Sequence, residues 1–242
     1  MATSEKPGLE VCFSPALLHL YDTRDKIVVI IDIFRATSTI TAALDNGAKC
    51  IIPVASVAEC ISVGASISGS ITAGERDGVV AEGLQHGNSP LEYPPAFIKD
   101  KTLVLTTTNG TRLLHMVKGA AAIVIGSFLN LSAIIAYLRQ QNTSVILGCA
   151  SWKDKFNIED TLFAGAVVAA LKDSFEIHDD SARGAWQIYL RSGGSDFLAF
   201  LNDSSHYKRL SRFGLYKDME YCCTPDLHPV VPYLNKNEII IM

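Results

Sequence analysis

Acidic and basic side chains follow several short apolar runs of this 242-residue sequence, and two more acids open a long apolar stretch. They are Asp32, Arg35, Glu75, Arg76, Glu159 and Asp160. Carboxylate oxygens suit hard cations such as Mg²⁺, and a guanidinium binds phosphate or sulfonate through two parallel hydrogen bonds. Together these residue types predict a site for a metal ion and an anion.

The run TTTNGT, residues 106–111, combines hydroxyls, an amide and a glycine. A helix is expected to start at Thr111, and backbone N–H groups at a helix start bind anions. An ordinary turn with hydroxyl caps is the alternative. The run GNSP at 87–90 is typical of a turn followed by a helix with Pro near its start. No Walker loop or dinucleotide fingerprint occurs, so a nucleotide site is a poor fit.

Several of these residues also have structural interpretations. Asp32 could cap a helix, and Arg35 could pair with Asp32 or lie at the surface. Glu159 and Asp160 would stabilise the dipole of the helix that they open. Cys149, at the end of an apolar run, reads as a small buried residue.

The elements that must position these side chains alternate along the first two thirds of the chain. Apolar, β-branched runs predict strands at 9–13, 27–32, 50–54, 71–73, 102–106, 121–125 and 145–149. Helices are predicted at 37–46, 57–67, 111–118, 131–141 and 159–172. This alternation indicates an α/β fold with a mostly parallel or mixed sheet and helices on both faces. Ligands bind beyond the carboxyl ends of such strands, where the polar residues lie.

The remaining chain is less regular. Residues 74–95 read as a long functional loop. The final third, from about residue 173 to 242, predicts helices at 182–190, 196–201 and 206–213 and a last strand at EIIIM. We interpret residues 1–242 as one domain. The uncharged stretch 119–138 has polar residues at its centre, which favours strand, loop and helix over a membrane span.

Composition narrows the class of protein. The net charge of −4 argues against a nucleic-acid or anionic-membrane partner. The six cysteines are scattered, and no basic-then-apolar leader opens the chain, so reduced thiols and a cytoplasmic location are expected. Closed dimers are the commonest assembly, so a homodimer is expected.

Six of the motifs occur in an order typical of one family. They are DIFRATSTI (32–40), GER (74–76), GNSP (87–90), TTTNGT (106–111), GSFLN (126–130) and the helix start at Glu159–Asp160. With them the chain resembles the 2-phosphosulfolactate phosphatase family, the ComB-like proteins. The resemblance runs from about Val11 to the CTPDLHPVVP segment, so it covers nearly the whole chain.

The resemblance implies a three-layer α/β/α fold and a Mg²⁺-dependent phosphatase that converts 2-phospho-3-sulfolactate to 3-sulfolactate and phosphate. In methanogens this step belongs to coenzyme M biosynthesis. The site positions that it implies are Asp32, Arg35, Ser38, Glu75, Arg76, Asn88, Ser89, Thr107, Thr108, Asn109, Gly110, Thr111, Ser127, Asn130, Glu159 and Asp160.

From these positions we expect Asp32, Glu75 and Asp160 to bind Mg²⁺, with Glu159 acting through a water or as a base. Arg35 is expected to act in catalysis. Arg35 and Arg76 together are expected to bind the sulfonate, carboxylate or phosphate. The hydroxyl-rich loop and the amides at its end are expected to bind the other oxygens.

Several alternatives remain open. The substrate could be another small phosphorylated acid, or the chain could be a non-catalytic anion-binding module. Water or Asp32 could attack phosphorus; Phe34 stands where a second aspartate follows the nucleophile in haloacid dehalogenases, which favours water. The chain departs from the family at Phe34 and in CASWKDKFNIED, where Trp152 could reshape the pocket and change the substrate.

Overall fold

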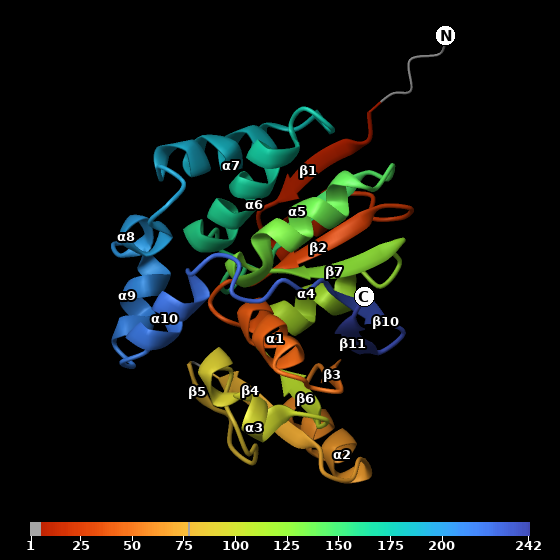
Figure 1. The fold of residues 1–242 in the computed structure, drawn as a ribbon, viewed down its shortest axis with the longest axis vertical. Helices are drawn as coiled ribbons and strands as arrows, with labels where there is room; N and C mark the ends of the chain where they lie inside the picture. The colour runs from red at the N-terminus through yellow and green to blue at the C-terminus, as the bar shows by residue number, and fades with distance from the viewer. Residues whose placement is uncertain (1–5, 77) are drawn as a thin grey trace.

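The computed structural model describes residues 6–76 and 78–242, which form an α/β fold around an eleven-stranded sheet (Figure 1). The strand order is β5-β4-β6-β3-β11-β10-β7-β2-β8-β1-β9. The strands are β1 (Gly8–Cys12), β2 (Ile27–Ile31), β3 (Cys50–Pro53), β4 (Ile71–Arg76), β5 (Val79–Val80), β6 (Thr102–Thr106), β7 (Ala122–Gly126), β8 (Val145–Cys149), β9 (Glu176–Ile177), β10 (Pro232–Asn235) and β11 (Glu238–Ile241).

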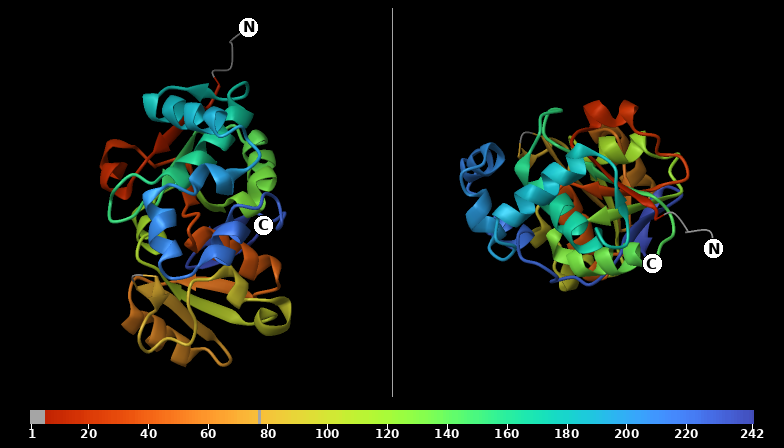
Figure 2. Two further views of the ribbon diagram at one scale, coloured as in Figure 1. Left: turned by 90° about the vertical axis from the view of Figure 1, so that its left-hand side faces the viewer. Right: turned by 90° about the horizontal axis from the view of Figure 1, so that it is seen from above.

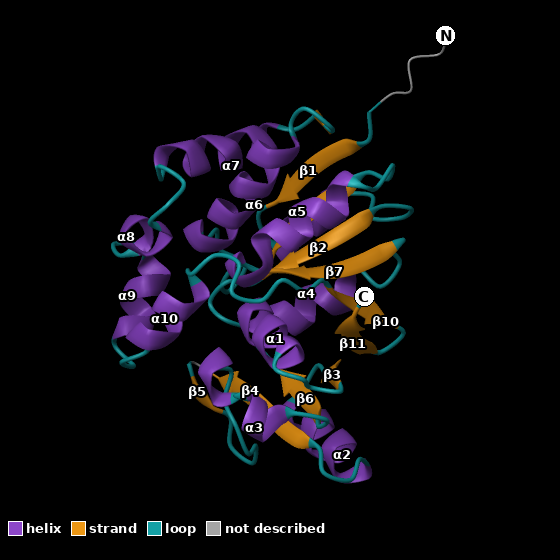
Figure 3. Ribbon diagram, in the orientation of Figure 1, coloured by secondary structure: helices purple, strands orange, loops and turns teal. Residues whose placement is uncertain are grey.

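Two parallel blocks make up most of this sheet. One block holds β4, β6 and β3, and the other holds β7, β2, β8, β1 and β9. The antiparallel hairpin β10–β11 lies between them and pairs with β7 on one side and β3 on the other. Figure 3 shows this hairpin between the upper and lower groups of strands. The mixed character of the sheet therefore comes mainly from the hairpin.

Helices cover both faces of the sheet (Figures 1 and 2). The α-helices are α1 (Ala36–Asp45), α2 (Val57–Ser66), α3 (Pro95–Ile98), α4 (Gly110–Met116), α5 (Leu131–Arg139), α6 (Ile158–Leu171), α7 (Asp180–Arg191), α8 (Phe197–Leu201), α9 (Ser205–Ser211) and α10 (Tyr216–Cys222). Short 3₁₀ helices are η1 (Pro15–Leu20), η2 (Pro90–Glu92) and η3 (Phe128–Asn130).

The strands bury apolar side chains on both faces, which explains their continuous apolar runs. On one face Val29 of β2 packs in a core with Ile134 of α5 and Leu162 of α6. On the other face Val28 of β2 packs in a second core with Ile40 of α1. These two cores give the α/β/α layering that the sequence predicted.

Some expected elements differ from those observed. The predicted loop 74–95 contains the end of β4, the strand β5 and η2, which Ser89 caps by accepting from the Leu91 N–H at 3.2 Å. The predicted single last strand is a hairpin, because Pro232–Asn235 folds back on Glu238–Ile241. The uncharged stretch 119–138 forms β7, η3 and all of α5 except its last residue, as expected. Within the described residues no helix is both long and apolar enough to cross a bilayer.

Candidate active site

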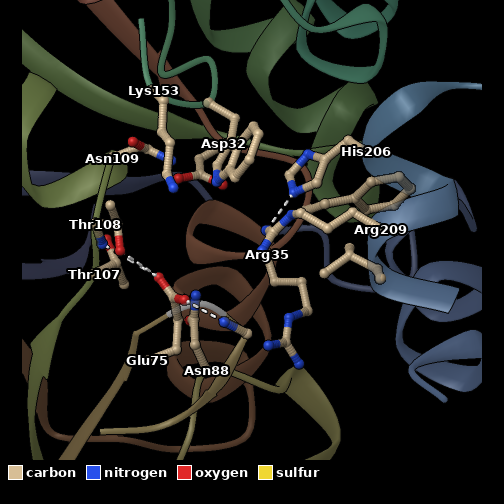
Figure 4. A pocket seen from close by; sticks show the side chains of 14 residues that line it. Asp32, Arg35, Glu75, Asn88, Thr107, Thr108, Asn109, Lys153, His206 and Arg209 are labelled. Carbon is tan, nitrogen blue, oxygen red and sulfur yellow. Dashed lines mark hydrogen bonds between the residues drawn. The ribbon is translucent and has the colours of Figure 1, made fainter. Parts of the chain in front are cut away.

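A small polar pocket lies at the carboxyl edge of the parallel strands (Figure 4). Its walls come from the loops that follow β2, β6 and β8, from Glu75 of β4, from Asn88 and from α9. Because both parallel blocks end at this edge, the pocket contains side chains from both. The predicted convergence of polar residues at strand ends is therefore present.

Asp32 lines this pocket directly after β2. Its Oδ1 accepts the Ala36 N–H at 3.3 Å, and only 8% of the residue is exposed. Burial raises the pKa of Asp32 to about 6, and the nearby carboxylate of Glu75 adds to this rise. Gly110 makes room for this carboxylate, since a Cβ there would lie 2.9 Å from Asp32 Oδ2.

Glu75 faces the pocket from the other parallel block. Its Oε1 accepts the Thr108 hydroxyl at 3.0 Å, and its Oε2 accepts the Gly78 N–H at 3.0 Å. Thr107 and Asn109 continue the same wall. The TTTNGT loop thus positions a carboxylate as well as lining the pocket, which the sequence alone did not indicate.

Asn88 adds a third oxygen to this carboxylate wall. The residue is buried and lines the pocket beside Glu75 (Figure 4). Among the described residues nothing donates a hydrogen bond to its Oδ1. A buried acceptor without a donor is costly, so a ligand with a donor or a cation would satisfy it.

Arg35 lines the pocket and forms a buried ion pair. Its Nη1 contacts Oδ2 of Asp218, which comes from α10. Asp218 Oδ1 in turn accepts the Ser89 hydroxyl at 2.9 Å. One carboxylate therefore holds a residue of the DIFRATSTI motif and a residue of the GNSP motif together.

Two further cations reach the pocket around one indole ring. Lys153 Nζ and the guanidinium carbon of Arg209 each lie 4.7 Å from the ring centroid of Trp152. Such cation–π contacts fix the direction of flexible side chains. Trp152 thus shapes the pocket, as its departure from the expected sequence suggested.

Comparison with known proteins agrees with this geometry. The model of the 2-phosphosulpholactate phosphatase family matches residues 12–237. The chain belongs to this family.

Curated relatives of similar length support the assignment. A protein of Thermotoga petrophila named probable 2-phosphosulfolactate phosphatase is 41% identical and aligns over 89% of this chain and 92% of its own length. Proteins with the same name from Caldanaerobacter subterraneus subsp. tengcongensis and Carboxydothermus hydrogenoformans are 38% and 36% identical. Those alignments cover 90% and 96% of this chain, and 91% and 96% of the relatives. The chain is thus a member of a family of phosphatases, hydrolases acting on phosphoric monoesters.

Not every position implied by the family resemblance reaches the pocket of this family member. Asp160 lies outside the pocket lining; its Oδ1 accepts the Ile33 N–H at 2.9 Å and its Oδ2 the Ser151 N–H at 3.1 Å. Burial raises the pKa of Asp160 well above its usual range, and the neighbouring Glu159 and Asp32 add to the rise. In this arrangement Asp160 ties the loop after β2 to the loop after β8.

Glu159 is also set back from the pocket, behind a histidine. The carboxyl is fully buried, and its Oε1 contacts Nδ1 of His206, which does line the pocket. His206 Nε2 contacts Nη2 of Arg209 at 2.9 Å (Figure 4). Glu159 thus reaches the pocket through His206.

Four other expected substrate-binding residues make internal contacts instead. Arg76 donates to the Glu75 carbonyl at 2.7 Å, and Ser38 donates to the Ile33 carbonyl at 2.9 Å. Asn130 Oδ1 accepts the Ser127 N–H at 2.9 Å, which caps η3. Their side chains lie outside the pocket lining.

Gly110 and Thr111 also lie outside the pocket lining. Thr111 closes the hydroxyl-rich loop by donating to the Thr107 carbonyl at 2.8 Å.

The residues that sequence reasoning missed are Lys153, His206, Arg209 and Asp218. The spacing of His206 and Arg209 was a usable signal, because residues three apart share one face of a helix. Asp218 had no local signal, since its partner Arg35 is 183 positions away in the sequence.

Proposed function

We propose that this chain is a Mg²⁺-dependent phosphatase that hydrolyses 2-phospho-3-sulfolactate to 3-sulfolactate and phosphate. One observation carries the proposal beyond family membership. The pocket lining combines two carboxylates, Asp32 and Glu75, with cations on Lys153 and Arg209. That combination suits a substrate with several anionic groups and a divalent cation that shields its phosphoryl oxygens.

The residues present fit Mg²⁺. Asp32 and Glu75 offer hard carboxylate oxygens, and the buried Oδ1 of Asn88 lacks a donor among the described residues. Mg²⁺ in proteins commonly takes one or two carboxylates, waters and substrate phosphate. We therefore assign Asp32 and Glu75, with Asn88, to hold it, and Asp160 to hold the loops around Asp32. When bound, the ion would neutralise charge on the phosphoryl oxygens.

The anionic groups of the substrate would be bound by cations and hydroxyls from different elements. Lys153 and Arg209 approach from the loop after β8 and from α9, whereas Thr107 and Asn109 belong to the loop after β6. Arg35 is already paired with Asp218, so its remaining guanidinium N–H groups would orient an oxygen without adding a full net charge.

We propose that water attacks phosphorus directly. Asp32 is held for the cation in this proposal, so it would not form a phosphoenzyme. Acid quenching of a reaction with ³²P-labelled substrate tests this point. A label that stays on wild-type protein and is lost in Asp32→Asn would establish an aspartyl-phosphate instead.

The proposed function is tested by phosphate release from 2-phosphosulfolactate, with Mg²⁺ and with EDTA, beside a panel of phosphorylated organic acids. Fast release from the sulfonated substrate alone, and only with Mg²⁺, is the expected result. Release from another phosphorylated acid alone would support the same site with a different substrate. Hydrolysis of such an acid is our second candidate function, because the Trp152 ring limits which substrates fit beside Arg209. Binding without release from any ester would indicate an anion-binding module.

A further inference from the structure

His206 is the histidine of the pocket wall, and its two ring nitrogens have different partners. Nδ1 contacts the carboxylate of Glu159, from α6, and Nε2 contacts Arg209 at 2.9 Å. Rings of Phe34 and Trp152 lie beside the imidazole, with centroids 6.0 and 6.3 Å away. His206 itself is 6% exposed. Four side chains from separate elements thus fix one imidazole at the pocket.

These partners determine which nitrogen carries the proton. A guanidinium has only donors, so Nε2 accepts from Arg209 and bears the lone pair. The single proton of the neutral ring is then on Nδ1 and is donated to Glu159. A histidine oriented by a buried carboxylate, with its other nitrogen free of a proton, is the arrangement of a general base.

We propose that His206 is the proton acceptor for the water that attacks phosphorus, and that Glu159 is its positioning residue. This inference rests on the proposed phosphatase function and assigns a residue that the sequence analysis did not consider for it. An anionic substrate oxygen would compete with Nε2 for the Arg209 guanidinium. If the Arg209 guanidinium bonded the substrate instead of Nε2, the Nε2 lone pair could accept a proton from the attacking water. Substrate binding and activation of the water would then be linked.

The proton balance of the step is complete. The water oxygen bonds to phosphorus while the bond from phosphorus to the bridging oxygen breaks, and the bridging oxygen keeps the electron pair. The water proton goes to Nε2. The leaving oxygen takes a proton from a second water, and the hydroxide so formed removes the proton from Nε2. Glu159 and Arg209 contact His206 during this cycle, and Asp32 lines the same pocket.

The matched control is the other buried histidine with a carboxylate partner. His228 contacts Asp45 Oδ2 at 2.7 Å through Nδ1 and the Tyr221 hydroxyl through Nε2, but lies outside the pocket lining. We expect His206→Gln to lower kcat about 100-fold or more with KM changed only a few-fold. His228→Gln is expected to leave kcat unchanged, and Glu159→Gln to lower it about tenfold or more.

Chemical rescue distinguishes a proton acceptor from a residue with a structural role, because added imidazole can replace only the former. Imidazole added to His206→Ala should restore turnover in a saturable way, and more basic imidazoles should restore more. Wild-type turnover is measured first: its absence on every ester refutes the proposed function, whereas turnover with an unaffected His206→Gln refutes only this inference. A folded His206→Ala protein that imidazole does not rescue would also overturn it.

Discussion

Arg35 and Asp218 form a buried ion pair, although 183 positions separate them in the sequence. The side chains are 5% and 8% exposed, so neither charge has water as an alternative partner. Removing one partner of such a pair leaves the other charge buried and alone. Asp218 therefore connects the helices of the C-terminal third to the pocket.

Asp218→Ala should lower the free energy of unfolding by about 3–5 kcal/mol and raise KM, because Arg35 loses both its counter-charge and its orientation. Urea unfolding and steady-state kinetics measure the two effects. Ser89→Ala removes the hydroxyl contact with Asp218 and the cap on η2, and should cost about 1–2 kcal/mol. Equal stability of Asp218→Ala and wild type would contradict the importance of this pair.

Asp32→Asn should abolish most of kcat at saturating Mg²⁺ and yet stabilise the metal-free protein at pH 7. Burial raises the pKa of Asp32 from 3.8 to about 6. Folding therefore favours the protonated acid, and stability is lost as pH rises from about 4 through 6. The neutral amide avoids this loss, a gain of about 2–3 kcal/mol at pH 7.

Thermal unfolding of both metal-free proteins between pH 4 and pH 8 checks the sign. The difference should shrink toward pH 4, where Asp32 is protonated in the folded protein and only partly ionised in the unfolded chain. Added Mg²⁺ should stabilise wild type and have little effect on Asp32→Asn, since a ligand that binds only the folded state stabilises it. Glu75→Gln should likewise lose most of kcat. Near-normal kcat in either variant would remove that residue from the metal site.

Gly110→Ala should lower kcat about tenfold by displacing the Asp32 carboxylate. The new Cβ would lie 2.9 Å from Asp32 Oδ2 and 2.9 Å from the Ala36 Cβ, so something must shift. Gly119→Ala is the control, because a Cβ there would meet nothing within 4 Å. Kinetics of the two variants side by side decide the question, and equal kcat values would argue against a position-sensitive Asp32.

Arg209→Ala should raise KM about 10- to 100-fold for a substrate with several anionic groups, because a charge-assisted hydrogen bond contributes about 1.5–3 kcal/mol. The increase should be smaller for a simple alkyl phosphate. Arg212→Ala, on an exposed residue three positions later, should change neither value. A uniform increase for all substrates would indicate that Arg209 only supports the Trp152 wall.

Much of the fold could be predicted because it depends on local patterns. Continuous β-branched runs such as KIVVIID gave β2, and alternation with helices gave the parallel sheet. The hairpin β10–β11 was predicted as a single last strand, and the short strand β9 was not predicted. Pro232 obscured the first hairpin strand, and β9 has two residues, too few for any period to show.

Site residues that directly follow strands could be predicted from the sequence. Site residues on helices that pack over the pocket could not. Asp32, Glu75 and Thr107 line the pocket because sheet topology alone brings strand ends together. His206 and Arg209 arrive from α9, whose position depends on packing in the C-terminal third. Arg76 was expected in the pocket, but its side chain donates to Glu75 and Thr106 instead.

The hairpin between the two parallel blocks has a consequence for synthesis. Asp32 and Lys153 are attached to one block, and Glu75 and Thr108 to the other. Yet β10 and β11 follow all those residues in the sequence, so a ribosome delivers both walls before the strands that join them. A nascent chain that has emerged only as far as α10 would hold the two blocks through their shared core and the contacts of α1, but without the strand pairing of the hairpin, so its affinity for phosphorylated ligands should be weaker than after the hairpin has formed.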